Sequence, residues 1–330
     1  MRRVAMIPVG FVTAAAVVAA ATTATGACGD AGPDLPPVGD PAGQIPEFDG
    51  AAAYSLLERQ VAFGPRAPGT PGHRRQLDWM VDFLRERADT VVIQRFTHID
   101  DDDDGEGDGG RDTLRMANVF ARFLPGRTER VLLLAHWDTR PVAERDPEPD
   151  RREQPIPGAN DGASGTAVLL HMADVLSSHS PPIGVDLLLV DGEDQPPGAR
   201  LLGSTHFAAN PPPGYRPLYG VLVDMVADRD PVFPVEGYSQ DYAPSVVRRV
   251  WRTAEELGYG SLFPDRVVGP IRDDHVPLNR AGIPTIDIID FEYGPGNRYW
   301  HTHRDELAQT APVGLEAVGT VLTTLIFRGG

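Results

Sequence analysis

The sequence has a single cysteine, Cys28, and fewer basic than acidic residues. One cysteine cannot form an internal disulfide, so other interactions must stabilise the fold. Lysine and arginine number 30 against 47 aspartates and glutamates, which gives a net charge of −17. We therefore expect no nucleic-acid partner, because a phosphate-binding surface needs clustered basic residues. The acidity also argues against attachment to an anionic membrane through protein charge, and we attribute it to solubility.

Long apolar runs are absent after the first segment. There, two arginines precede an apolar stretch from Val4 to Ala21, and small residues follow up to Cys28. This order predicts a secretory signal peptide over residues 1–28 and hence an exported protein. The residues before Cys28 resemble a bacterial lipoprotein signal, which implies a lipid anchor on Cys28 and a periplasmic or cell-surface lipoprotein. Ordinary cleavage nearby, giving a secreted protein, is the alternative.

Residues 29–46 are rich in proline, glycine and aspartate, which predicts a flexible linker. From residue 47 to 330, helical and strand patterns alternate, and we predict a single catalytic domain. The predicted strands cover 91–96, 116–124, 131–135, 185–190, 221–223 and 285–289, and the predicted helices cover 51–63, 73–88, 164–176, 204–209, 244–257 and 313–327. Several strands are continuous apolar runs, typical of strands buried on both faces. The sequence thus predicts an α/β fold, a three-layer α/β/α arrangement with a mixed, mostly parallel twisted sheet covered by helices.

Acidic and histidine side chains follow the predicted strands, at the edge where such sheets bind ligands. They are His136, Asp161, Glu193, Asp194, Asp224 and His301. Each alone has an ordinary explanation; Asp161, for example, could be a helix N-cap. Together, clustered carboxylates repel each other unless a cation compensates them, and carboxylate with imidazole suits zinc. We therefore predict a zinc site at this edge.

The glycine-rich stretch GANDGASG around Asp161 has a competing interpretation as a phosphate-binding loop. It lacks the lysine and the glycine spacing of such loops, and Asp161 at its centre would repel phosphate. Its glycines instead allow a tight turn that points Asp161 back at the strand edge.

The motifs HWD, GANDGASG, VDGED, LLGSTHFA, LVDM, DDHVPLNRAGIP and WHT occur in this order. From about residue 50 to the end, the set resembles the zinc aminopeptidase-type metallopeptidase family that includes the glutaminyl-peptide cyclotransferases, and FGPR near the start resembles a cyclotransferase segment. The resemblance implies a zinc aminopeptidase-like fold. It also implies that Asp161, Asp194 and His301 bind Zn²⁺ and that Glu193 is the catalytic proton shuttle. At the position of Asp194, cyclotransferases carry glutamate. Aspartate and glutamate both supply a carboxylate oxygen as a metal ligand.

The family contains two chemistries. In an aminopeptidase, zinc and Glu193 would activate water to hydrolyse the first peptide bond, and a second metal would occupy the positions of His136 and Asp224. In a glutaminyl cyclase, the α-amine of an N-terminal Gln attacks the side-chain amide, which releases ammonia and forms pyroglutamate.

The resemblance of DDHVPL and of Trp300 to cyclotransferase sequences favours cyclisation. It implies that Trp300 binds the Gln side chain, and that Asp273 and Asp224 are catalytic acids that share a proton. We predict a monomeric glutaminyl-peptide cyclotransferase with one zinc ion, acting on peptide or protein N-termini. A two-metal aminopeptidase is the alternative.

Several residues also have structural explanations. Asp273 and Asp274 could cap a helix near His275, and Trp300 could belong to the core. We expect His303 to face solvent or to lie outside the metal shell, and His206 to pack in a helix. A third hypothesis is a binding protein that retains zinc without turnover, although such a protein would not need Glu193.

Overall fold

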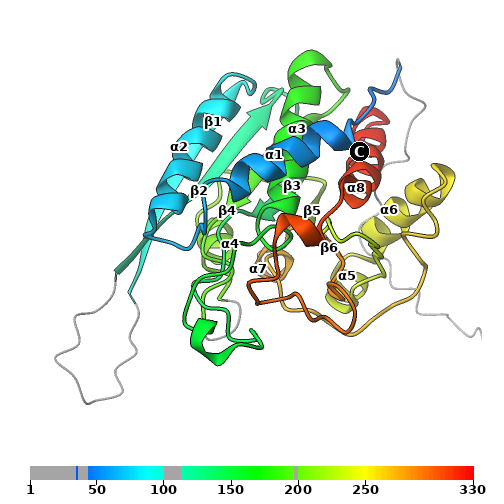
Figure 1. Ribbon diagram of the computed structural model, residues 1–330. Coiled ribbons are helices and arrows are strands. Elements are labelled where there is room, and N and C mark those ends of the chain that lie inside the picture. Colours follow the sequence, from blue (N-terminus) through cyan, green and yellow to red (C-terminus); the bar gives the residue numbers. More distant parts are fainter. Residues whose placement is uncertain (1–34, 36–43, 100–112, 197–199) are drawn as a thin grey trace, which may run out of the picture. The chain divides into compact units, whose positions relative to one another are not determined.

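Six strands form one twisted sheet in the part of the chain that the structure, a computed structural model, describes: residues 35, 44–99, 113–196 and 200–330 (Figure 1). Their order across the sheet is β1-β2-β4-β3-β5-β6. The strands are β1 (Thr90–Ile99), β2 (Thr113–Phe123), β3 (Arg130–His136), β4 (Gly184–Val190), β5 (Tyr219–Asp224) and β6 (Thr285–Ile289). The pairs β4·β3, β3·β5 and β5·β6 are parallel, whereas β1·β2 and β2·β4 are antiparallel. The predicted mixed, mostly parallel sheet is confirmed.

Helices cover both faces of this sheet. They are α1 (Gly50–Val61), α2 (Pro71–Arg85), α3 (Ser164–Ser178), α4 (Leu202–Ala209), α5 (Gly237–Tyr242), α6 (Pro244–Glu256), α7 (His275–Arg280) and α8 (Pro312–Phe327), with short 3₁₀ helices at Pro149–Arg151 and Leu307–Gln309. Every predicted helix and strand is present, with ends within three residues of those expected. The 3₁₀ turns and α5 have no counterpart in the sequence prediction.

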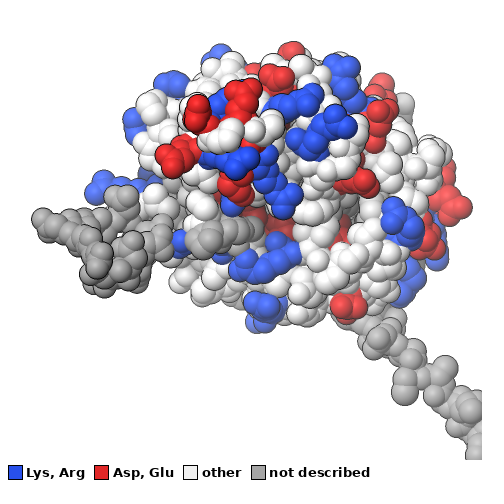
Figure 2. Space-filling model, turned by 60° about the horizontal axis from the view of Figure 1, so that its bottom comes forward, with Lys and Arg blue, Asp and Glu red and all other residues white. Residues whose placement is uncertain are grey.

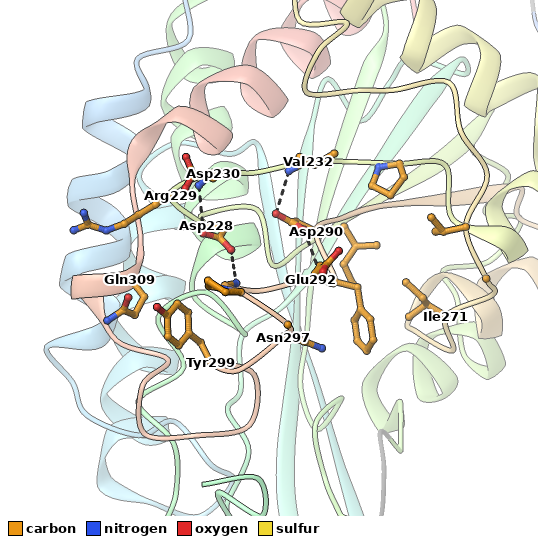
Figure 3. A pocket seen from close by; sticks show the side chains of 18 of the residues that line it. Asp228, Arg229, Asp230, Val232, Ile271, Asp290, Glu292, Asn297, Tyr299 and Gln309 are labelled. Atoms are coloured by element: carbon orange, nitrogen blue, oxygen red, sulfur yellow. Dashed lines mark hydrogen bonds between the residues drawn. The ribbon is translucent and has the colours of Figure 1, made fainter. Parts of the chain in front are cut away.

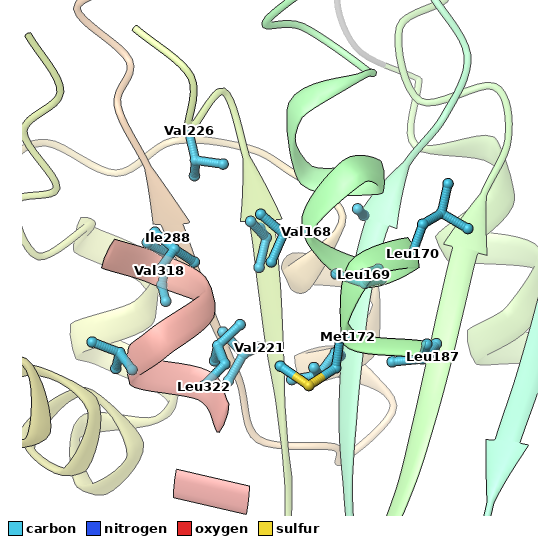
Figure 4. Packing of buried hydrophobic residues seen from close by; sticks show 14 of the residues in the cluster. Val168, Leu169, Leu170, Met172, Leu187, Val221, Val226, Ile288, Val318 and Leu322 are labelled. Carbon is cyan, nitrogen blue, oxygen red and sulfur yellow. The ribbon is translucent and has the colours of Figure 1, made fainter. Parts of the chain in front are cut away.

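The core has two layers because alternate side chains of each central strand point to opposite faces. On β3, Leu133 packs in the larger cluster with α1, α2, α3, α6 and α8, whereas Leu132 and Leu134 pack in the smaller cluster with α4 and α7. Figure 4 shows the larger cluster, where Val168 of α3 and Leu322 of α8 lie over β5. Burial on both faces explains why the central strands are apolar throughout.

Local signals set the starts of several helices. The Asp49 side chain accepts the N–H groups of Ala51 and Ala52, and the Thr70 hydroxyl accepts the N–H of His73. Helices α2, α6 and α8 begin with proline, which loses no hydrogen bond at that position. Among the described residues, no helix combines the length and the apolar character needed to cross a membrane. The predicted signal peptide with Cys28, and nearly all of the predicted linker, lie outside the described residues.

One close approach fixes α3 against the sheet. A Cβ atom on Gly165 would lie 1.9 Å from the backbone oxygen of Val223 and 3.1 Å from the Cβ of Ala135. Only glycine permits this contact between α3 and β5. As a result, the turn that precedes α3 lies directly beside the ends of β3 and β5.

Candidate active site

The predicted acidic and histidine residues meet at the carboxyl ends of the parallel strands. Within the described residues, two groups of three side chains have candidate ligand atoms that all lie within 4.8 Å of one another. One group is Asp161, Asp194 and His301, and the other is His136, Asp161 and Asp224. Asp161 belongs to both groups, so it lies between two candidate metal positions. All five side chains are buried.

Asp161 lies in a turn held by a distant segment. The Asp305 carboxylate accepts the N–H groups of Asn160, at 2.7 Å, and Asp161, at 3.2 Å. Gly158 and Gly162 on either side have φ of 65° and 98°, a region that favours glycine. Helix α3 begins only at Ser164 and has no side-chain cap. The alternative that Asp161 is an N-cap is therefore wrong, and its carboxylate is available to the site.

His301 enters the site on strained backbone. Its φ of 56° lies in the left-handed region, which is uncommon for residues other than glycine and clusters at functional sites. Its Nδ1 lies 2.7 Å from Oε1 of Glu144, and its Nε2 lies 3.5 Å from Oδ1 of Asp194. A carboxylate on one imidazole nitrogen is the usual way to orient a histidine whose other nitrogen binds metal.

Arg140 connects the same carboxylate to a second candidate ligand. Its guanidinium donates to Asp194 at 2.5 Å and to the second oxygen of Glu144 at 2.7 Å. Glu144 and Arg140 therefore fix both His301 and Asp194. Burial and the nearby Asp161 carboxylate raise the pKa of Asp194 to about 7, against the opposing effects of His301 and Arg140.

His136 and Asp224 face each other in the second group. His136 Nε2 lies 3.1 Å from Asp224 Oδ1 and 3.3 Å from Asp161 Oδ1. Burial by itself lowers the pKa of His136, but the Asp224, Asp138 and Asp161 carboxylates outweigh it and raise this pKa well above its usual value. The carboxylates thus attract a positive charge to this position, which a proton on His136 or a metal cation can supply.

Glu193 is positioned by its backbone. Asp138 accepts the N–H groups of Glu193, at 3.1 Å, and of Asp194, at 3.3 Å, which fixes the loop after β4. Burial raises the pKa of Glu193 well above its usual value, and Asp194 and Asp273 raise it further, although His136 opposes them. A carboxyl group with a raised pKa can both accept and donate a proton near neutral pH, as a shuttle must.

Asp273 lies beside Asp224 at the same edge. Burial and the neighbouring Asp224 carboxylate raise the pKa of Asp273 well above its usual value, and burial also raises that of Asp224. Helix α7 begins at His275, and its N-cap Asp274 makes no side-chain cap bond but accepts the Ser204 hydroxyl. The capping alternative is therefore wrong for Asp274.

A pocket of about 440 Å³ contains these groups, and its lining includes Asp161, Glu193, Asp194, Trp300 and His301. Figure 2 shows a hollow near the centre of the forward face, with acidic side chains inside and basic side chains around it. Trp300 is half-buried and its ring centroid lies 3.8 Å from that of His301 and 4.9 Å from that of Phe291. Trp300 therefore forms a wall of the pocket while also packing against the neighbouring small cluster.

The donor set fits a divalent cation. Asp161, Asp194 and His301 offer two carboxylates and one imidazole, a set of oxygen and nitrogen donors that suits a catalytic zinc ion with an open position. The buried Asp194 Oδ2 has no hydrogen-bond partner, so it retains the capacity to bind a cation. Uncompensated, so many buried carboxylates would repel one another.

The sequence prediction missed four residues that hold the site: Asp138, Arg140, Glu144 and Asp305. The first three lie in the loop after β3, which has no helical or strand period. Two signals were present: the motif HWD contains Asp138, and Arg140 and Glu144 are four residues apart shortly after it. His303 lies outside the pocket, with Nδ1 2.9 Å from Asp146, and His206 on α4 stacks on Phe96, as expected for a packed residue.

Comparison with known proteins identifies the family of this chain. Residues 118–326 match the sequence model of peptidase family M28. The chain belongs to peptidase family M28. Two curated relatives are 26% identical to it: the glutaminyl-peptide cyclotransferase-like protein of Mus musculus over 243 residues and the glutaminyl-peptide cyclotransferase of Bos taurus over 254 residues. Each match covers 64% of this chain, and 60% and 66% of the respective relative, so the chain spans less than two thirds of their length.

Solved structures of similar proteins match over nearly their full length. The glutaminyl cyclase of Bacteroides thetaiotaomicron, bound to N-acetylhistamine, is 35% identical with a TM-score of 0.80, covering 86% of this chain and 99% of that one. The glutaminyl cyclase of Porphyromonas gingivalis is 37% identical with a TM-score of 0.76, covering 84% and 97%. A Zn-dependent exopeptidase of Parabacteroides distasonis is 33% identical with a TM-score of 0.80, covering 86% and 99%. The predicted fold and the predicted similarity to the glutaminyl cyclase branch of the family are confirmed.

Proposed function

We propose that this protein is a zinc-dependent glutaminyl-peptide cyclotransferase that converts N-terminal Gln of peptides or proteins to pyroglutamate and ammonia. The observation that carries the proposal is one pocket that combines the Asp161, Asp194 and His301 group with Glu193 and with the wall formed by Trp300. The similarity to bacterial glutaminyl cyclases supports the choice of reaction.

Each residue of the pocket would have its own role in cyclisation. A Zn²⁺ ion on Asp161, Asp194 and His301 would supply Lewis-acid polarisation of the substrate's side-chain amide. Trp300 orients the Gln side chain so that the α-amine reaches the amide carbon, and this positioning contributes much of the acceleration. As the new C–N bond forms, Glu193 accepts a proton from the amine. It then donates that proton to the departing nitrogen as the old C–N bond breaks, which releases ammonia.

We propose that one ion suffices and that Asp224 and Asp273 act through protons. The raised pKa values of both carboxyls and the 3.1 Å contact between Asp224 and His136 support this role. The second candidate function is a two-metal aminopeptidase. The group His136, Asp161 and Asp224, together with the similarity to a Zn-dependent exopeptidase, favours that alternative.

The deciding experiment incubates the zinc-loaded protein with one peptide that begins with Gln and a matched peptide that begins with Leu. A cyclase releases ammonia from the first peptide without shortening it and leaves the second intact. Release of free Leu would overturn the proposal in favour of an aminopeptidase. Bound zinc with no change in either peptide would indicate a binding protein. Metal analysis of the active protein gives the number of ions.

We also propose that the protein is exported and works as a monomer. The arginine, apolar and small-residue order before Cys28 supports export. Cell fractionation and mass spectrometry of the mature N-terminus distinguish a lipid-anchored Cys28 from ordinary cleavage. Sedimentation of the purified protein tests the monomer.

A further inference from the structure

Arg66, the arginine of the FGPR motif, is a buried cation that takes no part in the chemistry proposed above. Its side chain is fully buried, at 0% exposure. Burial lowers its pKa to about 10, although the Asp305, Asp138 and Asp161 carboxylates oppose this effect. The guanidinium therefore stays charged at neutral pH inside the protein. A buried charge is costly unless other groups compensate it, so its hydrogen-bond partners indicate what it does.

The Arg66 guanidinium binds the carbonyl groups of the turn that carries Asp161. Its Nη1 donates to the carbonyl of Pro157, and its Nη2 donates to the carbonyl of Gly158 at 2.5 Å. Its backbone N–H donates to the Thr139 hydroxyl at 2.8 Å, which connects the segment between α1 and α2 to the loop after β3. The planar fork of arginine suits two neighbouring acceptors, whereas the ammonium of lysine is a compact point charge.

The N–H groups of the same turn are bound from another segment. Asp305, also fully buried, accepts the N–H of Ala159 through its backbone oxygen at 3.2 Å, and its carboxylate accepts those of Asn160 and Asp161. One turn thus has its N–H groups on a buried acid and its carbonyl groups on a buried cation. Hydrogen bonds from a charged donor are stronger than those between neutral groups. The position of the Asp161 carboxylate therefore depends on Arg66 as well as on Asp305.

Asp305 belongs to a part of the chain with contacts of its own. The segment 289–299, which precedes it, lines a neighbouring pocket of about 980 Å³ together with Asp228 (Figure 3). There the Asp228 carboxylate accepts the N–H of Gly294 at 2.7 Å. Because this contact does not involve Arg66, we expect a change at Arg66 to act first on the carbonyl side of the turn.

We propose that Arg66 is a positioning residue of the metal site, whose fork holds the turn so that the Asp161 carboxylate reaches the candidate zinc position. This inference rests on the proposed function, which places Zn²⁺ on Asp161, Asp194 and His301. Arg66 acts through Asp161, because its hydrogen bonds are to the backbone of the turn.

The test measures zinc affinity in Arg66→Lys, with Arg85→Lys, at an exposed arginine of α2, as the matched control. Lysine keeps the positive charge, so the electrostatic effect on a cation at the site is retained while the fork is lost. The full-length protein is freed of metal and titrated with Zn²⁺ against a chelator of known affinity. We expect Arg66→Lys to bind zinc about 10-fold more weakly, the lower end of the range for groups that position a metal ligand. Arg85→Lys should match the wild type.

A double-mutant cycle with Asp305 separates positioning from a general loss of stability. Asp305→Asn should also weaken zinc binding, because it changes the group that holds the N–H side of the turn. If both residues hold one turn, the loss of zinc affinity in the double variant is smaller than the product of the two single losses. Urea unfolding of the metal-free variants measures their stability separately.

Thr139→Val covers the case in which Arg66→Lys does not fold. It keeps the Arg66 guanidinium but removes the hydroxyl that accepts the Arg66 N–H, whereas the control Thr139→Ser keeps that hydroxyl. We expect zinc binding about threefold weaker in Thr139→Val than in Thr139→Ser, because one hydrogen bond is lost. Equal zinc affinity in these two variants would overturn the proposal.

The outcomes separate this inference from the proposed function. A wild-type protein that binds no zinc would overturn both. If the wild type binds zinc without cyclising a peptide that begins with Gln, the proposed reaction fails and the zinc titrations still decide the role of Arg66. If the wild type does both, but Arg66→Lys and Arg85→Lys bind zinc equally well, the inference alone is overturned. Independent losses in the cycle would also overturn it, because Arg66 and Asp305 would then act on different parts of the site.

Discussion

Replacing Gly165 by alanine should disturb both the fold and the site. The added methyl group would lie 1.9 Å from the backbone oxygen of Val223, about half of a comfortable contact, and no side-chain rotation can relieve it. Alanine in a helix gains about 1 kcal/mol over glycine, but overpacking a core costs about 1–3 kcal/mol, and a backbone obstacle belongs at the upper end. We expect a net loss of about 2 kcal/mol in the free energy of unfolding.

The same displacement should reach the metal site. The Ser164 hydroxyl accepts the N–H of Val226, and Asn160 Oδ1 accepts the N–H of Ala227, so α3 and the end of β5 move together. A shift of about 1 Å at a catalytic centre can lower turnover by about 100-fold. Zinc affinity should fall as well, because Asp161 lies in the turn before α3.

Urea unfolding measures the stability change, and zinc titration measures the effect on the site. Gly126→Ala is the matched control, because a Cβ at Gly126 meets no atom within 4 Å, and it should leave both quantities close to wild type. If Gly165→Ala is as stable as Gly126→Ala and binds zinc equally well, α3 does not pack against β5 as described.

Three further predictions concern the site itself. Glu193→Gln should retain zinc by metal analysis but lower ammonia release by about 100- to 10,000-fold, and substantial remaining activity would refute the proton-shuttle role. Asp161→Ala should lose zinc, because this carboxylate belongs to both ligand groups; a full zinc content would contradict that assignment. Glu144→Ala should weaken zinc binding by about 10- to 100-fold, because the His301 imidazole would lose the carboxylate that orients it. The control Glu153→Ala, at an exposed residue, should not change zinc binding. Equal zinc affinity in the Glu144 and Glu153 variants would show that Glu144 does not position the ligand.

The sequence was sufficient for the elements of the fold because its hydrophobic pattern is strong. The run Val131–Ala135 is typical of a strand buried on both faces, and β3 occupies that position in the centre of the sheet. The hydrophobic pattern does not predict the order of the strands in the sheet. That β2 pairs antiparallel with β4, between β1 and the parallel strands, depends on contacts between distant segments.

The candidate ligands were predictable because each follows a strand or begins a loop at one edge of the sheet. The residues that hold them were not. Glu144 contacts His301, which is 157 residues away in the sequence. Asp138 accepts the backbone N–H of Glu193, which is 55 residues away. The hydrophobic periodicity of the sequence does not predict such partners, because tertiary contacts determine the positions of these loop residues.

The hydrogen bonds of Asp305 have a consequence for how the site is assembled during synthesis. Asp305 holds the turn of Asp161 although 144 positions separate them in the sequence, and its own segment also carries His301. A ribosome adding about 5–20 residues per second synthesises Asp161 and Asp194 several seconds before it reaches Asp305. The growing chain therefore contains Asp161 before it contains Asp305, which holds the turn of Asp161, and before it contains the third candidate ligand, His301. The complete group of Asp161, Asp194 and His301 therefore exists only after the segment that carries His301 and Asp305 has been synthesised.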